Sequence, residues 1–320
     1  MDLNERIALI TRNVAEILGE ERLRDLLLRK KRPITYCGYE VSGGIHLGHL
    51  VTITKLQDLA KAGFKVKVLF ADWHTWLNQK GDWAFIRQEV KHWRQGFQAA
   101  GLEDAEFILG STFQRKPEYI DDVMTLIVKT TIHRALRSMQ QVARDIEHAK
   151  VSQVFYPFMQ IVDIKHLGID LVHSGLEQRK IHALGIELLP GIGYSAPIFV
   201  HTPLISSLKG EGKMSSSDPS SMISIQDSEE AVTDKIKGAF CLPGKPQGAL
   251  FEILRLVIFP HHPILSIKRA PQHGGDLEVS SFPELERLFL AKKVHPLDLK
   301  GAAAAALNDI LAPIRRHFKT

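Results

Sequence analysis

Two histidines three residues apart, His46 and His49, stand where an apolar stretch passes through a glycine-rich turn into a segment with helical spacing. A strand, a glycine turn and a helix N-terminus together favour anions, because unpaired backbone N–H groups and the helix dipole face the ligand. Imidazole N–H groups placed there can bond phosphate oxygens as charge develops on them. The segment alone equally allows a helix cap with two solvated histidines, and no H-E-x-x-H pattern supports zinc.

A second segment, 210–217, reads Gly-Glu-Gly-Lys-Met-Ser-Ser-Ser and predicts a flexible cationic loop around Lys213. A lysine on a mobile loop suits the neutralisation of phosphate charge that appears only in a transition state. By itself such a segment is more often a solvated linker. Its coincidence with the two histidines in an α/β chain is what favours phosphate chemistry.

A third pattern places a phenol, an amide and a carboxylate on one face of a helix. Tyr156, Gln160 and Asp163 are spaced by four and three residues, and Pro157 suits the first position of the helix. Such groups are costly to bury unless they find partners, either within the fold or on a polar ligand. In a pocket, Asp163 could accept a hydrogen bond from a hydroxyl while Gln160 and Tyr156 face an ammonium group.

Composition restricts the class of protein. The 320 residues are 44% hydrophobic and 24% charged, with 41 basic and 36 acidic residues and a net charge of +5, as in ordinary globular proteins. No apolar run approaches the roughly 18 residues of a membrane span, and no signal peptide is visible. Two distant cysteines predict no disulfide framework. We therefore expect a cytoplasmic protein that does not contact membranes.

Alternating strands and helices predict an α/β fold with a parallel sheet covered on both faces. The first 30 residues have the apolar spacing of two helices. The strand-like runs are 34–39, 65–71, 106–109, 170–172 and 198–200. The helical segments between them are 47–62, 83–100, 118–127, 131–149 and 177–189. Beyond residue 218 the pattern is helical, at 229–240, 250–257, 282–290 and 296–318.

The two phosphate motifs together resemble the HIGH and KMSKS signatures of class I aminoacyl-tRNA synthetases. Over nearly the whole chain the sequence is similar to tyrosyl-tRNA synthetases of the archaeal and eukaryotic type. The segments that carry this resemblance are 36–49, 71–74, 77–81, 110–114, 156–163, 175–182, 213–217 and 295–300. It implies a Rossmann-like catalytic domain over 33–212, preceded by N-terminal helices (1–32) and followed by a loop (213–225) and a smaller helical anticodon-binding domain (226–320).

The resemblance implies activation of L-tyrosine with ATP and Mg²⁺, then transfer to tRNA(Tyr). Tyr36 and Asp163 would hold the phenol, with His74 in the same pocket. The α-amino group would be held by Tyr156, Gln160 and Gln178. The ATP site would comprise Gly38, Glu40, His46, Gly48, His49 and Glu177, and the pyrophosphate would meet Lys213, Ser215 and Ser216. His46, His49, Lys213, Ser215 and Ser216 are the expected catalytic residues, and no protein metal ligand is expected.

For tRNA, the resemblance implies that Arg179 and Lys180 reach the first acceptor base pair. Arg134 and Arg137 are candidate phosphate contacts. His295 and Asp298 would read the first anticodon base, and His273 stands where an aromatic ring is expected to stack on it. A homodimer is also implied, with its interface near 115–160.

Several residues depart from the family pattern, namely Val41, Trp73, Trp76, Lys165, His166 and His173. For the tryptophans a change in core packing is favoured over a pocket reshaped for a tyrosine analogue. Three other functions stay open: tryptophan ligation on the same fold, a small-molecule adenylyltransferase, and a non-catalytic RNA-binding paralogue. The Tyr36 and Asp163 pair argues against tryptophan, because indole has no phenolic hydroxyl.

Overall fold

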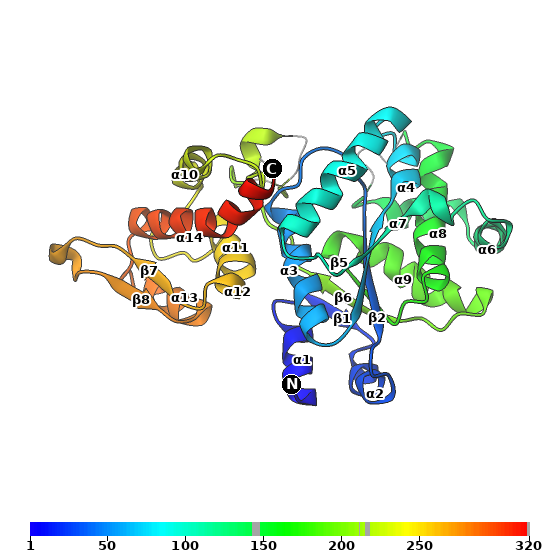
Figure 1. The fold of residues 1–320 in the computed structure, drawn as a ribbon, viewed down its shortest axis with the longest axis horizontal. Coiled ribbons are helices and arrows are strands. Elements are labelled where there is room, and N and C mark those ends of the chain that lie inside the picture. The colour runs from blue at the N-terminus through cyan, green and yellow to red at the C-terminus, as the bar shows by residue number, and fades with distance from the viewer. Residues whose placement is uncertain (143–147, 211, 215–217, 319–320) are drawn as a thin grey trace. The chain divides into compact units, whose positions relative to one another are not determined.

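The computed structural model describes residues 1–142, 148–210, 212–214 and 218–318 (Figure 1). The chain forms two compact units. The first unit comprises 1–42, 55–94 and 102–203, and the second comprises 43–54, 95–101 and 204–320. Among the described residues, no helix has the length and apolar character needed to cross a bilayer.

The first unit is built on a six-stranded sheet, which contains the five predicted strands and a sixth, β1, that the sequence pattern did not predict. Its strands are β1 (Glu16–Leu18), β2 (Ile34–Tyr39), β3 (Lys65–Phe70), β4 (Glu106–Leu109), β5 (Leu171–Gly175) and β6 (Ile198–Thr202). Their order is β1-β6-β5-β2-β3-β4, and all neighbours are parallel except β1 and β6. Every residue of β5 and β6 is buried, which is typical of parallel strands covered on both faces.

The N-terminal segment corrects one prediction. Residues 3–11 form helix α1 (Leu3–Thr11), but Glu16–Leu18 forms β1 rather than part of a helix. Asn13 adopts a left-handed φ of 53°, which stops the helix, and β1 then pairs antiparallel with β6 so that Glu16 faces His201. The apolar residues Ile17 and Leu18 therefore belong to an edge strand of the sheet and do not continue the first helix.

Helices and short 3₁₀ turns connect the strands of the first unit. They are η1 (Glu20–Arg22), α2 (Leu23–Arg29), α3 (Leu47–Lys61), α4 (Asp72–Leu77), α5 (Trp83–Ala99), η2 (Gly110–Thr112), α6 (Pro117–Val128), α7 (Ile132–Met139), α8 (Val151–His166), η3 (Leu176–Gln178), α9 (Arg179–Leu188) and η4 (Leu189–Ile192). The predicted helix over 131–149 ends at Met139, and residues 143–147 lie outside the described part. Figure 1 shows α8 and α9 on the opposite side of the sheet from residues 55–61 and 83–94.

Helix α8 also begins earlier than the sequence predicts. It runs from Val151 with Lys150 as its N-cap, so Pro157 lies inside the helix instead of at its first position. Proline is common in the first turn of a helix, but here it stands in the interior, where one helical hydrogen bond is given up within a well-packed segment. Because the spacing of Tyr156, Gln160 and Asp163 stays helical, their common face is preserved.

The strand order reverses between β2 and β5. From β2 the chain proceeds through β3 to β4 on one side, and from β5 it proceeds to β6 on the other. In open α/β sheets, ligands bind at the carboxyl ends of the two strands that flank such a reversal. Glu40 follows β2 and Glu177 follows β5, so the topology alone directs attention to this edge of the first unit.

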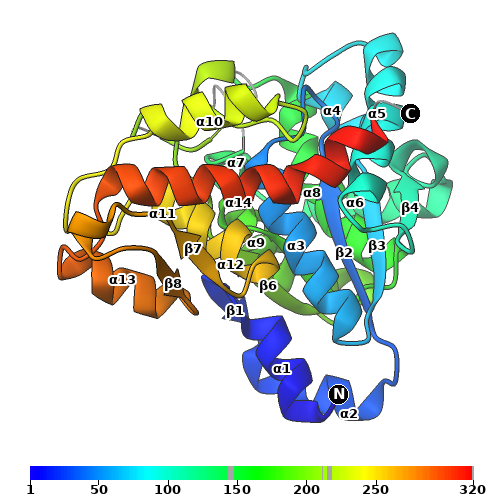
Figure 2. The ribbon, with the colours of Figure 1, turned by 60° about the vertical axis from the view of Figure 1, so that its left-hand side comes forward.

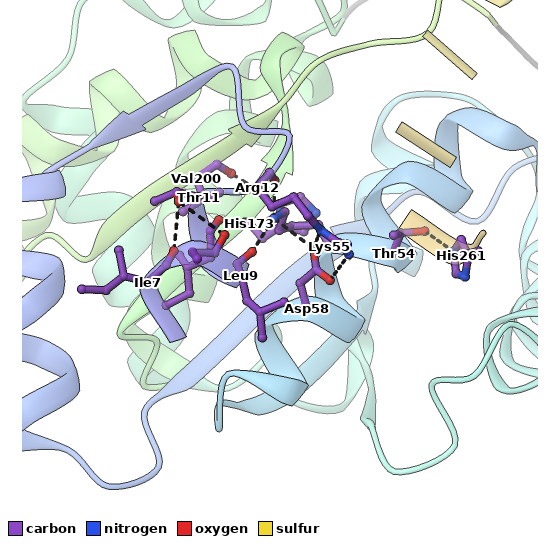
Figure 3. A network of polar contacts seen from close by, with 12 residues as sticks. Ile7, Leu9, Thr11, Arg12, Thr54, Lys55, Asp58, His173, Val200 and His261 are labelled. Atoms are coloured by element: carbon purple, nitrogen blue, oxygen red, sulfur yellow. Dashed lines mark hydrogen bonds and ion pairs between the residues drawn. The ribbon is translucent and has the colours of Figure 1, made fainter. Parts of the chain in front are cut away.

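A buried cation holds α1 against α3 in the first unit (Figure 3). Lys55 is 2% exposed, and its Nζ donates to the carbonyl oxygens of Leu9, Ile10 and Arg12 at 2.9, 3.3 and 2.5 Å. These carbonyls lie at the end of α1, where a helix lacks internal donors and its dipole favours positive charge. Asp58, 3.2 Å from the ammonium, balances its charge, while burial lowers the pKa of Lys55 to about 8.

Most of the described second unit beyond residue 218 is helical, as the sequence pattern of that part predicts (Figure 2). Besides residues of α3 and α5, it contains η5 (Pro219–Ser221), α10 (Glu229–Gly238), α11 (Ala249–Ile253), a π-helical segment η6 (Leu254–Ile258), α12 (Phe259–His261), β7 (Leu265–Ile267), η7 (Pro271–His273), β8 (Leu277–Val279), α13 (Phe282–Leu290) and α14 (Pro296–His317). The long α14 packs against α10. The antiparallel β7–β8 ladder was not predicted, because strands of three residues leave little periodic signal.

Candidate active site

A buried carboxylate lies at the centre of the candidate amino-acid pocket. Asp163 of α8 is 1% exposed, and its Oδ1 accepts hydrogen bonds from Gln114 Nε2 and the Tyr119 hydroxyl, both at 2.8 Å. Its Oδ2 lies 3.8 Å from His74 Nε2. Tyr36 of β2 is 2% exposed and close enough for the Asp163 charge to act on its phenol. Side chains from β2, α4, α6 and the turn before α6 therefore act on this one carboxyl group.

Burial controls the charge of this cluster. It raises the pKa of Asp163 to about 7, while the donors Gln114 and Tyr119 act against that rise. Burial also lowers the pKa of His74 to about 3, so the histidine is neutral and its contact with Asp163 is not an ion pair at neutral pH. Burial and the Asp163 charge raise the pKa of Tyr36 well above its usual range, which keeps this phenol protonated.

The raised pKa predicts a pH-dependent cost to stability. Between the ordinary value of 3.8 and about 7, the folded chain keeps a proton on Asp163 that the unfolded chain has lost. Wild-type stability must therefore fall as pH rises through this window, whereas Asp163→Asn escapes the loss. Relative to wild type, we expect the ligand-free variant to gain on the order of 4 kcal/mol between pH 4 and pH 7.5.

Thermal unfolding midpoints of both chains at pH 4 and pH 7.5 measure this gain. The asparagine can still accept from Gln114 and Tyr119, so the variant keeps its local packing. A midpoint difference that is equal at the two pH values contradicts the raised pKa of Asp163.

The other polar side chains of α8 lie beside a set of buried acceptors. Gln160 Nε2 donates to Gln178 Oε1 at 3.3 Å, and Gln178 Nε2 donates to Glu177 Oε1 at 3.4 Å. Among the described residues, Gln160 Oε1 and Glu177 Oε2 are buried without a hydrogen-bond partner. Buried acceptors without donors are costly, and a cationic ligand would satisfy them.

Tyr156 connects this region with the phenol end of the pocket. Its side chain is buried, its ring meets the His74 ring edge-on at 4.6 Å between centroids, and its hydroxyl hydrogen-bonds Glu40. Glu40 accepts in addition from Asn78 Nδ2 at 2.8 Å and forms an ion pair with Lys80. Glu40 is thus fixed at the carboxyl end of β2, next to the exposed Gly38.

In the second unit, the turn into α3 fixes the protons of both candidate catalytic histidines. His46 N–H donates to His49 Nδ1 and Gly48 N–H donates to His46 Nδ1, each at 3.1 Å. Because each Nδ1 accepts, each neutral ring carries its hydrogen on Nε2. The rings lie 3.9 Å apart, so the turn presents two neighbouring N–H donors. A β-carbon on residue 48 would lie 2.8 Å from His46 Cε1, which explains the glycine.

The segment around Lys213 is held by backbone pairing. Ser206 and Lys213 form an antiparallel bridge, and Met214 N–H donates to Ile205 O at 2.8 Å. Lys213 is exposed. The burial of His46, together with the positive charge of Lys213, lowers the pKa of His46 to about 4. The charge of Lys213 therefore acts on the neutral imidazole of His46. Ser215 and Ser216 lie outside the described residues.

Each basic residue proposed for tRNA has a different local setting. Arg179 Nε donates to Glu16 at 2.6 Å, Lys180 to Gln140 at 2.5 Å and Arg134 to Glu187 at 2.5 Å, while Arg137 is exposed. In the second unit, His295 caps α14 by accepting from Leu297 N–H at 3.2 Å, and Asp298 lies in the first turn of that helix. His273 is exposed at the end of η7.

The structure adds two residues to the pocket that sequence reasoning did not assign, Gln114 and Tyr119. Gln114 lies in a segment that carries the family resemblance, which was the available signal. Tyr119 is fully buried on α6, and only its contact with Asp163 reveals its role.

The departures from the family pattern have mostly structural explanations. Lys165 and His166 both bind Asp122 of α6, at 2.7 and 2.8 Å. Trp73 packs on the core and contacts the rings of Trp76 and Trp83. Trp76 is 42% exposed, so its expected place in the core is wrong; its ring instead stacks on Trp83 near the surface.

A mostly parallel sheet with a strand-order reversal, a polar cluster around a buried carboxylate and a paired histidine turn are together typical of an aminoacyl-tRNA synthetase of class I. The family of class I tRNA synthetases (W and Y) matches residues 28–312, and this chain belongs to it.

Its relatives in that family are full-length matches. The tyrosine–tRNA ligase of Methanoculleus marisnigri is 48% identical over 306 residues, 96% of each chain. The tyrosine–tRNA ligase of Methanopyrus kandleri is 45% identical, over 99% of this chain and 98% of its own. The crystal structure of the tyrosyl-tRNA synthetase of Archaeoglobus fulgidus, complexed with L-tyrosine, superposes with a TM-score of 0.96 at 44% identity, covering 99% of both chains.

Proposed function

We propose that this chain is a tyrosine–tRNA ligase, which activates L-tyrosine with ATP and transfers it to tRNA(Tyr). The observation that carries this specificity is Asp163, buried beside Tyr36 and held by Gln114 and Tyr119. An ionised carboxylate can accept the hydrogen bond of a ligand phenol, and the neutral Tyr36 hydroxyl can bond the phenol oxygen. An indole ring offers no group for the second of these bonds.

The pocket also accounts for the other end of the amino acid. Gln160 Oε1 and the tyrosine hydroxyl at 156 are suited to an α-ammonium group, with Gln178 supporting the amide. His74, neutral and packed edge-on against Tyr156, forms part of the wall.

Activation needs no attacking side chain. A carboxylate oxygen of tyrosine attacks the α-phosphorus of ATP, and pyrophosphate leaves with the electron pair of the broken P–O bond. The charge that grows on the phosphate oxygens is stabilised by the Nε2–H groups of His46 and His49 and by the ammonium group of Lys213. Ser215 and Ser216 contribute to the same stabilisation. Gly38, Glu40, Gly48 and Glu177 complete the ATP site, and Mg²⁺ enters as part of the ATP substrate.

Transfer then requires tRNA contacts from the catalytic part of the sequence (33–212) and from its C-terminal helical part. The terminal ribose hydroxyl attacks the tyrosyl carbonyl carbon, and AMP leaves. Arg179 and Lys180 contact the acceptor end, with Arg134 and Arg137 on phosphates. In the C-terminal helical part (226–320), His295 and Asp298 read the anticodon, and His273 stacks on its first base.

We also infer a homodimer that works in the cytoplasm. Among the described residues of 115–160, five large apolar side chains are exposed, namely Ile120, Met124, Val128, Ile132 and Val151, at 39%, 45%, 86%, 62% and 75%. The three on α6 are spaced by four residues and form one apolar stripe. Such a patch is unusual on a monomer and supports an isologous interface.

ATP–pyrophosphate exchange with each of the twenty amino acids tests the proposed function. Exchange that depends on tyrosine alone is the expected result. Exchange with tryptophan alone would assign the chain to the other branch of its family. Silence with all twenty, alongside retained tRNA binding, would support a non-catalytic paralogue.

A further inference from the structure

A row of polar side chains leads from Gln160 through the first unit to its surface. Gln160 Nε2 lies 3.4 Å from His182 Nε2, and His182 Nδ1 lies 2.9 Å from His201 Nε2. His201 Nδ1 lies 3.4 Å from Glu16 Oε2. Both histidines are almost completely buried, at 1% and 0% exposed, in α9 and β6. We call Glu16, His201 and His182 the histidine chain.

The carboxylate at the outer end fixes the direction of every hydrogen bond in the histidine chain. Burial lowers the pKa of His182 well below its usual value and that of His201 to about 4, so each ring is neutral with one N–H. His201 Nδ1 makes no hydrogen bond of regular geometry, but the anionic Glu16 oxygen 3.4 Å away attracts an N–H and repels a lone pair. This places the His201 hydrogen on Nδ1 and leaves Nε2 as an acceptor. His182 must then carry its hydrogen on Nδ1, and its Nε2 accepts from the Gln160 amide.

Arg179 keeps the outer end anionic. Its Nε donates to the same Glu16 oxygen at 2.6 Å, and this bond lowers the pKa of Glu16. Strand β1 places Glu16 directly opposite His201 in the β1–β6 pairing, so the backbone register brings the carboxylate to the imidazole. The three-residue strand β1 therefore both extends the sheet and holds Glu16 beside His201.

The inner end of the histidine chain determines which way the Gln160 amide faces. One hydrogen of its NH₂ group is directed to His182 Nε2 and the other to Gln178 Oε1, at 3.4 and 3.3 Å. The amide oxygen must then point away from both, and it is buried with no partner among the described residues. If the amide were reversed, its oxygen would meet an imidazole lone pair and its NH₂ group would face the incoming cation.

We propose that Glu16, His201 and His182 are positioning residues that aim the Gln160 oxygen at the α-ammonium group of the amino acid. This inference rests on the proposed function, because it takes a tyrosine-like ligand as the occupant. The histidine chain does not touch the ligand; it selects one of two amide orientations. Its loss should therefore weaken binding only for ligands that carry the ammonium group.

The test compares two ligands in the full-length chain, L-tyrosine and 3-(4-hydroxyphenyl)propionate, which lacks the amino group. Glu16→Ala removes the terminal acceptor at the surface, and His201→Phe breaks the histidine chain while keeping an aromatic ring. Both variants should bind L-tyrosine about ten- to a hundredfold more weakly, the range expected for a misdirected bond to a charged group. Binding of the desamino ligand, and KM for ATP in tRNA-free exchange, should stay unchanged.

Glu106→Ala is the matched control, since Glu106 pairs with Lys65 on another edge of the same sheet. An equal loss for both ligands would assign the histidine chain to folding alone, and unchanged tyrosine affinity in both variants would also overturn the proposal. Wild-type exchange with tyrosine, measured alongside, reports on the proposed function separately. A failure there appears in the wild type, whereas a failure of the histidine chain appears only in the comparison of variants.

Discussion

Asp163→Ala should abolish the preference for tyrosine over phenylalanine more completely than any other single change in the pocket. The substitution removes the acceptor for the ligand phenol and leaves Gln114 and Tyr119 without their shared partner. Tyrosyl-tRNA synthetases are themselves the standard example of discrimination by a buried polar site, about 10⁴–10⁵ against phenylalanine, and that magnitude is adopted from the class. We expect kcat/KM for tyrosine in pyrophosphate exchange to fall at least about 100-fold.

The same variant should treat phenylalanine no worse than wild type, because phenylalanine never made the lost bond. The ratio of the two kcat/KM values is therefore the decisive measurement, and it is insensitive to the fraction of active enzyme. Asp25→Ala, which removes an exposed carboxylate paired with Arg29, is the control. Near-normal tyrosine exchange by Asp163→Ala would refute the role of this carboxylate.

The sequence was informative about the pocket where the chemistry is local. Tyr156 and Asp163 were grouped by helical spacing, and in the structure both contact His74, through a ring contact at 4.6 Å and an approach of 3.8 Å. That grouping survives the wrong helix start, since a periodicity of 3.6 depends on the helix interior and not on its ends. The sequence likewise predicted that His46 and His49 follow a strand and a turn at the start of a helix.

Contacts between distant segments could not be read in this way. Tyr119 reaches Asp163 from another helix 44 residues earlier, and Glu16 reaches His201 from the opposite end of the first unit. No periodic pattern links such residues; only sheet order and helix packing bring them together. For the same reason β1 was mistaken for helix, because a three-residue strand is stabilised by its partner β6 and not by its own propensities.

The Nε2–H tautomers of the two histidines in the turn could not be predicted from the sequence. Sequence predicted imidazole donors at the helix start, but only the bonds from His46 N–H and Gly48 N–H to the two Nδ1 atoms define which nitrogen donates. Because His46 is buried and neutral, it can stabilise growing phosphate charge without first losing a proton to the ligand. Of His46 and Lys213, only the lysine therefore carries a positive charge.

Lys213→Ala should accordingly slow tyrosyl-adenylate formation by about 10²- to 10³-fold, the cost of removing one charge-stabilising group from a transition state. The positive charge of Lys213 lowers the pKa of His46, which supports a role for both side chains at the same phosphate groups. Since those phosphates become more negative only as pyrophosphate departs, the loss should fall on kcat, and KM for tyrosine should change little.

Single-turnover formation of the adenylate, followed by rapid quench at saturating ATP, measures this effect without interference from product release. Lys209→Ala is a close control, because Lys209 belongs to the same segment but is paired with Asp218 at 3.0 Å. If the two lysine variants lost activity equally, general electrostatic attraction of ATP would explain the result better than transition-state stabilisation. If Lys213→Ala raised KM for ATP while leaving kcat intact, the lysine would bind the ground state, and its proposed catalytic role would be wrong.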